Sequence, residues 1–97
     1  MIELSYGGEF DEQDLIDHIN QSGRNYIIQG QKVCTVQDHT KPSSLDYWLR
    51  QFAISPDMKQ ADNNIMAALV ATGMFTESVN LNCPDSNNPC KGLVIVE

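Results

Sequence analysis

The sequence predicts one small domain of the α+β class. Apolar and polar residues alternate at the beginning of the chain, which is the period of a β-strand, and two further strands are expected near its end. Between these ends, three stretches carry apolar residues at the spacing of an α-helix. The chain has 97 residues, enough for one modest core, so residues 1–97 are expected to form a single domain.

The first half of the chain predicts strand, helix and strands. Residues 1–6 alternate as in a half-buried strand, which two glycines end. Asp11 is expected to cap a helix that Gly23 ends. Residues 26–28 and 33–36 are rich in β-formers, and "QGQK" between them is a plausible hairpin turn.

The second half predicts two helices and a hairpin. Ser43 or Ser44 can cap the helix "LDYWLRQF", and Pro56 then interrupts the apolar period. Asp62 or Asn63 can cap a further helix, which ends at a glycine. The strands "SVNLN" and "GLVIV" follow, joined by the turn-rich loop "CPDSNNPCK".

This order of elements resembles the winged-helix family over roughly residues 10–97. The resemblance rests on "LDYWLRQF" as second helix, "DNNIMAALVATG" as third helix and "VNLNCPDSNNPCKGLVIV" as wing. It implies a winged-helix-like fold of three helices, a C-terminal β-hairpin and short N-terminal strands. The linker over residues 53–61 departs from the pattern, because a helix-turn-helix usually has a turn of ~3–4 residues.

The charge of the chain disfavours phosphate-rich partners. Its formal net charge is -7, and its six basic residues are scattered. Nucleic-acid binders draw affinity from clustered lysines and arginines. DNA is therefore disfavoured as a partner, and so is an anionic membrane surface. No apolar run reaches the ~20 residues that span a bilayer, and the N-terminus does not read as a signal peptide.

DNA binding nevertheless stays an alternative hypothesis, because the resemblance implies that the third helix could enter a major groove. The residues available for it are Arg50, Lys59, Asn63, Asn64 and Lys91. Asparagine can pair with adenine. The third helix has no arginine or lysine, however, and the two asparagines are more simply explained as helix-capping residues.

The leading hypothesis is a small acidic, non-enzymatic protein-interaction or regulatory module that acts through its helical face, by binding another protein or itself. The residues expected to form the contact are Tyr47, Trp48, Phe52, Met66, Val70 and Met74. A third hypothesis is an acidic inhibitor that mimics DNA. It rests on the acidic cluster Glu9, Asp11, Glu12, Asp14 and Asp17, which is more simply explained as a solvated helix face.

The sequence predicts no catalytic site, metal site or cofactor. Cys83 and Cys90 are seven positions apart, which fits no common zinc spacing. Three cysteines fit a reducing, cytoplasmic setting, so free thiols are expected, with a Cys83–Cys90 bridge as the alternative in an oxidising compartment. Cys34 is expected to be a small buried residue, and no Ser-His-Asp order or phosphate-binding loop is present.

Overall fold

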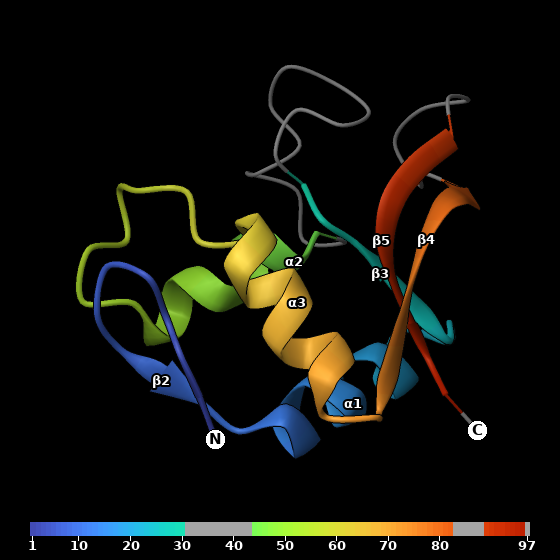
Figure 1. Ribbon diagram of the computed structural model, residues 1–97, viewed down its shortest axis with the longest axis horizontal. Helices are drawn as coiled ribbons and strands as arrows, with labels where there is room; N and C mark the ends of the chain where they lie inside the picture. Colours follow the sequence, from blue (N-terminus) through green and yellow to red (C-terminus); the bar gives the residue numbers. More distant parts are fainter. Residues whose placement is uncertain (31–43, 83–88, 97) are drawn as a thin grey trace.

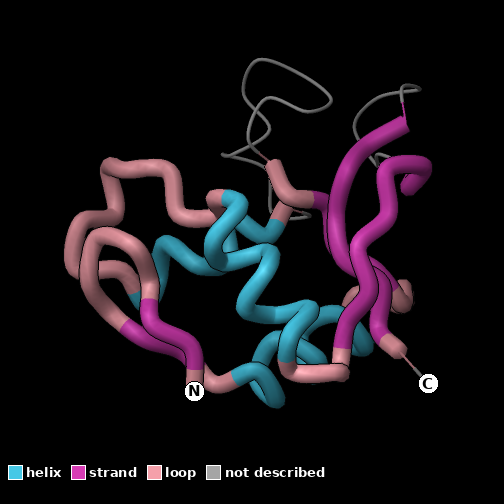
Figure 2. Tube along the Cα trace, viewed as in Figure 1, coloured by secondary structure: helices cyan, strands magenta, loops and turns pink. Residues whose placement is uncertain are grey.

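The computed structural model describes residues 1–30, 44–82 and 89–96. Within these ranges the chain forms three α-helices and five strands in two antiparallel sheets, which confirms the predicted α+β class. The elements are β1 (Ile2–Glu3), β2 (Glu9–Phe10), α1 (Glu12–Gln21), β3 (Tyr26–Ile28), α2 (Leu45–Leu49), the 3-10 turn η2 (Arg50–Phe52), α3 (Asn63–Ala71), β4 (Phe75–Asn82) and β5 (Pro89–Ile95). Figures 1 and 2 show the sheet of β3, β4 and β5 on one side, with β1 and β2 on the side away from it.

Local capping fixes the ends of the helices. Asp11 and Ser44 each accept a hydrogen bond from a backbone N–H in the first turn that follows, which confirms both predicted caps. Asp62 caps α3 in the same way. Gly23 and Gly73 both have a φ of 79°, the left-handed conformation that commonly terminates a helix.

The larger sheet has the order β3-β5-β4, so the predicted C-terminal hairpin pairs with the strand that follows the first helix. In its register Phe75 faces Ile95 across the hairpin, and Ile28 faces Gly92 on the other side of β5. The predicted strand over residues 33–36 and the tip of the hairpin loop lie outside the described residues.

The N-terminal strand is shorter than predicted. Only Ile2–Glu3 is in β1, because the chain reverses at Gly7 and Gly8 to pair with β2. Gly8 has no room for a side chain, because its φ is 102° and an added Cβ would lie 2.3 Å from the carbonyl oxygen of Phe52. The turn is tied to the α2–α3 linker by a 3.1 Å hydrogen bond from the Ile54 N–H to the Gly7 oxygen.

The core collects the apolar faces of all three helices and the inner face of the larger sheet. Its buried residues are Leu4, Phe10, Leu15, Ile19, Ile27, Leu45, Trp48, Leu49, Ala61, Ile65, Met66, Leu69, Phe75 and Leu93. The apolar stripe of α3 therefore stabilises the fold. Its residues Ile65, Met66 and Leu69 are at most 2% exposed.

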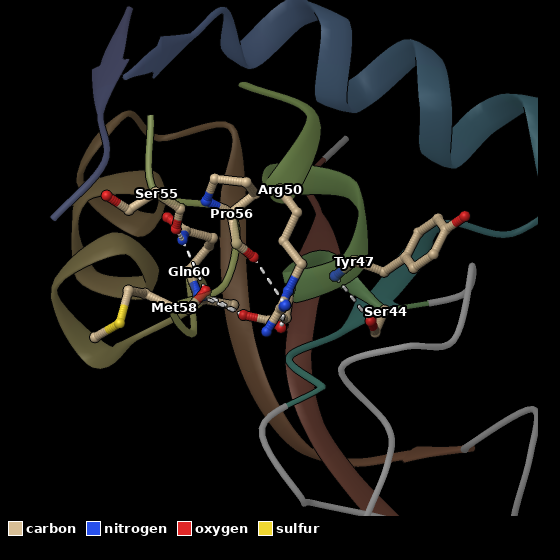
Figure 3. Close-up of polar contacts among 9 residues, drawn as sticks. Ser44, Tyr47, Arg50, Ser55, Pro56, Met58 and Gln60 are labelled. Carbon is tan, nitrogen blue, oxygen red and sulfur yellow. Dashed lines mark hydrogen bonds and ion pairs between the residues drawn. The ribbon is translucent and has the colours of Figure 1, made fainter. Parts of the chain in front are cut away.

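A buried carboxylate holds the long linker between α2 and α3. Asp46 is fully buried, and its Oδ1 accepts hydrogen bonds from the backbone N–H groups of Gln60 and Ala61 at 2.5 and 3.0 Å. Arg50 donates from Nε to the other oxygen at 3.1 Å. Figure 3 shows Arg50 extending toward the linker, where its Nη1 donates to the Pro56 carbonyl at 2.9 Å. One side-chain network thus holds the linker between α2 and α3 in place.

Cys90 corrects the expectation of free thiols. It lies fully buried on β5 beside Ile28, with Tyr26 packed against the pair. Cys90 is disulfide-bonded, so the free thiol expected at this position is wrong. Cys34 and Cys83 lie outside the described residues.

The described helices are short. The longest of them, α1, has 10 residues. A membrane-spanning helix needs about 20, and no helix in the described ranges has the length and apolar character to cross a bilayer.

Candidate binding groove between α1 and α2

One face of α1 carries four polar side chains at helical spacing. Asp14, Asp17, His18 and Gln21 occupy positions i, i+3, i+4 and i+7, which lie along one side of a helix. The apolar stripe of the same helix packs into the core. That packing turns the polar face toward solvent and toward α2.

An aromatic cluster lies against this face. The His18 ring stacks on the Trp48 indole, with ring centroids 5.5 Å apart and planes inclined by 27°. Phe52 and Phe10 contact the same indole edge-on at 4.9 and 5.6 Å. Trp48 is 8% exposed, whereas the adjacent Tyr47 is 48% exposed. The cluster therefore buries the indole and leaves the neighbouring tyrosine projecting from the surface.

Two neighbouring hollows lie beside this cluster, with volumes of about 330 and 420 Å³. Both are lined by His18, Trp48 and Gln51, so they form one depression, named here the α1–α2 groove. The remaining lining residues are Asp14, Asp17, Gln21 and Phe52 in the first hollow, and Tyr47 and Arg50 in the second.

The uncompensated charge of the groove is negative. Arg50 is paired with the buried carboxylate of Asp46, which offsets its charge. Asp14 and Asp17 are exposed, and no lysine or arginine among the described residues lies within ion-pair distance of either. Gln13 donates a hydrogen bond of 3.2 Å to Asp17, which orients that carboxylate without neutralising it.

His18 is the titratable group at the centre of the groove. Desolvation by partial burial lowers the pKa of His18 below its ordinary value of 6.5, because burial disfavours the charged imidazolium. The ring is therefore neutral at pH 7. At that pH His18 contributes an aromatic surface to the groove.

The structure brings together only half of the predicted interaction residues. Tyr47, Trp48 and Phe52 lie in the groove, although Trp48 is mainly a buried support. Met66 is 1% exposed, so its predicted role in a contact surface is wrong. Its helix places it in the core. The other two residues predicted on or just after this helix, Val70 and Met74, are respectively exposed and partly buried, and neither lines the groove.

The residues of the DNA-binding alternative lie on different elements. Asn63 and Asn64 are exposed in the first turn of α3, where Asp62 holds the capping position expected for them. Lys59 is exposed in the α2–α3 linker. Lys91 is on β5 and pairs with Glu77 at 3.0 Å. The strand β5 and the α2–α3 linker lie on opposite sides of the view in Figure 1.

The sequence patterns did not predict His18, Gln21 and Gln51 as groove residues. A signal for the first was present, since His18 shares the i, i+3, i+4, i+7 spacing with the acidic residues. No pattern of neighbouring residues indicates that this face of α1 lies against α2. Gln51 is held by a 2.9 Å hydrogen bond from its Nε2 to the Trp48 carbonyl.

Within the described ranges, no group of three or more His, Cys, Asp or Glu side chains is arranged to hold a metal ion. Comparison of the chain with protein families, curated proteins and solved structures gave no match.

Proposed function

We propose that this chain is a small acidic protein-interaction module of winged-helix type, and that it binds its partner in the α1–α2 groove. The observation that carries the proposal is the exposed ring of Tyr47, which stands beside a concave surface supported by Trp48 and His18. Aromatic side chains in such settings are common anchors of protein interfaces.

The connectivity supports the winged-helix assignment. After β2 the chain runs helix, strand, helix, helix, hairpin, and β3 pairs with the second strand of that hairpin. The assignment is consistent with the longer linker, because Asp46 supplies the hydrogen bonds that keep the linker against α2. Winged helices serve several functions, so the connectivity supports the fold and no particular role.

Charge pairing favours a protein partner over DNA. Two of the three basic residues that a DNA surface would use, Arg50 and Lys91, are each paired with a carboxylate. The neighbouring carboxylate offsets the charge that each would offer to a phosphate. The third, Lys59, would act alone, and a single cation contributes little to phosphate binding.

A non-enzymatic role stays part of the proposal, because the features that support it belong to a partner-binding surface. The exposed ring of Tyr47 lies beside the stacked rings of His18 and Trp48. A cytoplasmic location stays a sequence-based prediction. The disulfide at Cys90 counts against it, because cytosolic reductants keep most thiols reduced.

The test is affinity capture with three immobilised proteins: wild type, Tyr47→Ala and Tyr6→Ala. Tyr6 is the matched control, because it is 50% exposed and lies outside the groove. We expect proteins retained by wild type and by Tyr6→Ala to be lost with Tyr47→Ala. Equal capture by all three folded proteins would contradict the groove as the contact surface.

A further inference from the structure

The α1–α2 groove combines two chemical features that suit one kind of occupant. One wall presents the exposed carboxylates of Asp14 and Asp17, with no described cation to balance them. The opposite wall presents aromatic rings from α2 and η2, including the half-exposed ring of Tyr47. A carboxylate and an aromatic face both attract a cation, and they do so by independent interactions.

Resting on the function proposed above, we infer that the partner enters the α1–α2 groove with a basic segment, whose lysine or arginine side chains reach the carboxylates of Asp14 and Asp17 while their aliphatic stems pack on the aromatic wall. Long basic side chains suit this division, because their methylene groups cover apolar surface while their charged ends stay polar. The first hollow, which Asp14 and Asp17 line, is large enough for the charged end of one such side chain, at about 330 Å³. The second hollow, of about 420 Å³, is lined by Tyr47, Trp48 and Arg50 and no described carboxylate, so it suits the apolar part of the segment.

The overall charge favours the same occupant. The chain carries 13 acidic and 6 basic residues, a formal net charge of -7. A field of this sign accelerates the approach of a basic partner and opposes an acidic one. An apolar occupant would leave the two carboxylates desolvated and unpaired, which costs free energy. A second copy of this acidic chain would be repelled.

The groove contains its own reporter, because Trp48 is the only tryptophan of the chain. We would titrate the protein at low ionic strength with acetyl-(Lys-Ala)₅-amide and its arginine counterpart, and use acetyl-(Glu-Ala)₅-amide as the acidic control. We expect the two basic peptides, but not the acidic one, to change the Trp48 emission in a saturable way. The affinity should fall as added salt screens the charges. No change with either basic peptide would overturn the inference.

Two double variants that remove the same charge distinguish binding at the groove from a general effect of net charge. Asp14→Asn with Asp17→Asn removes two groove carboxylates. Glu3→Gln with Asp57→Asn removes the same charge from exposed positions outside the groove. We expect the first pair to weaken basic-peptide binding about tenfold, from two partly exposed ion pairs, and the second to change it by less than about twofold. If both double variants weaken peptide binding equally, the binding depends on net charge and not on the groove, and the inference is overturned.

The two proposals fail in different ways. If captured proteins depend on Tyr47 while the aspartate variants bind them as well as wild type does, the groove is a contact surface but the basic segment is wrong. If Tyr47→Ala captures the same proteins as wild type, the proposed function fails, whatever the peptides do.

Discussion

The buried carboxylate of Asp46 accepts a hydrogen bond of 3.0 Å from the backbone N–H of Ala61, 15 residues further along the chain. This bond joins the first turn of α2 to the end of the linker that leads into α3. It places α3 relative to α2 without a short turn. The same oxygen serves the Gln60 N–H, so a single side chain satisfies two buried backbone donors.

Asp46→Ala is expected to lower the free energy of unfolding by about 3–5 kcal/mol, because it leaves buried donors and Arg50 without their acceptor. Urea denaturation followed by far-UV circular dichroism measures the loss. Asp57→Ala is the control, since Asp57 is exposed in the same linker, and it should change stability by less than about 0.5 kcal/mol. A small loss for Asp46→Ala would mean that the linker does not depend on this network.

The sequence predicted what depends on neighbouring residues. Asp11 and Ser44 cap helices because each side-chain oxygen accepts a hydrogen bond from a backbone N–H only two or three residues further along the chain. Local geometry alone brings these groups together. The role of Asp46 could not be read in the same way. Its bond partners are 14 and 15 residues away, and they come within reach only when the linker is folded.

Substitution of the adjacent aromatic residues Trp48 and Tyr47 in α2 should reduce stability by very different amounts. Trp48 is 8% exposed at the centre of a ring cluster, so Trp48→Ala should destabilise the fold by about 3–5 kcal/mol through cavity formation. Tyr47 is 48% exposed, and Tyr47→Ala should cost less than about 1 kcal/mol. Thermal unfolding followed by circular dichroism compares them. Similar losses for both variants would argue against the buried position of Trp48.

The pKa of His18 makes stability depend on pH. Because burial lowers this pKa in the folded state, the unfolded chain takes up the proton first as the pH falls. Stability should therefore decline from about pH 6.5 downward, until the folded state is also protonated. His18→Gln should flatten the decline between pH 7 and pH 5 in urea denaturation, whereas Asn20→Gln, at an exposed position of the same helix, should not. An unchanged slope in His18→Gln would assign the decline to other groups.

The sequence predicted which residues of the candidate site share a helix face, but not which helix faces meet. Helical spacing grouped the aromatic residues of α2 and the acids of α1 separately. That these faces meet depends on the angle between two helices, which is set by the whole core. Met66 shows the reverse problem. An apolar stripe indicates burial without saying whether the fold itself or a partner covers it, and here the fold covers it.

The disulfide of Cys90 should contribute to stability. A native disulfide restricts the unfolded chain, and its loss typically costs about 2–4 kcal/mol. We expect a reducing agent to lower the melting temperature of the wild-type protein, and Cys90→Ala to lower it in non-reducing buffer. Cys90→Ala should respond less than wild type to the same reducing agent. Equal melting temperatures for wild type in oxidising and reducing buffer would contradict a stabilising bond at Cys90.

A side chain at Gly92 should destabilise the fold, because Gly92 lies opposite Ile28 in the antiparallel pair of β5 and β3, and the β3 backbone comes close at this point. A Cβ on Gly92 would lie 2.2 Å from the Ile27 carbonyl oxygen and 2.8 Å from the Ile28 Cα, so backbone would have to move. A glycine inside a strand often marks such an approach. Gly92→Ala is therefore expected to cost about 1–3 kcal/mol or more.

The variant should also loosen the pairing of β3 with β5. Hydrogen exchange would then accelerate at the backbone N–H of Gln29, which donates a hydrogen bond of 2.9 Å to the backbone carbonyl of Lys91. Thr76→Ala, at an exposed position on β4, is the control and should leave that exchange unchanged. If Gly92→Ala has the same stability and the same exchange rate as the wild type, β3 can shift at little cost. The close contact would then not explain why this position is a glycine.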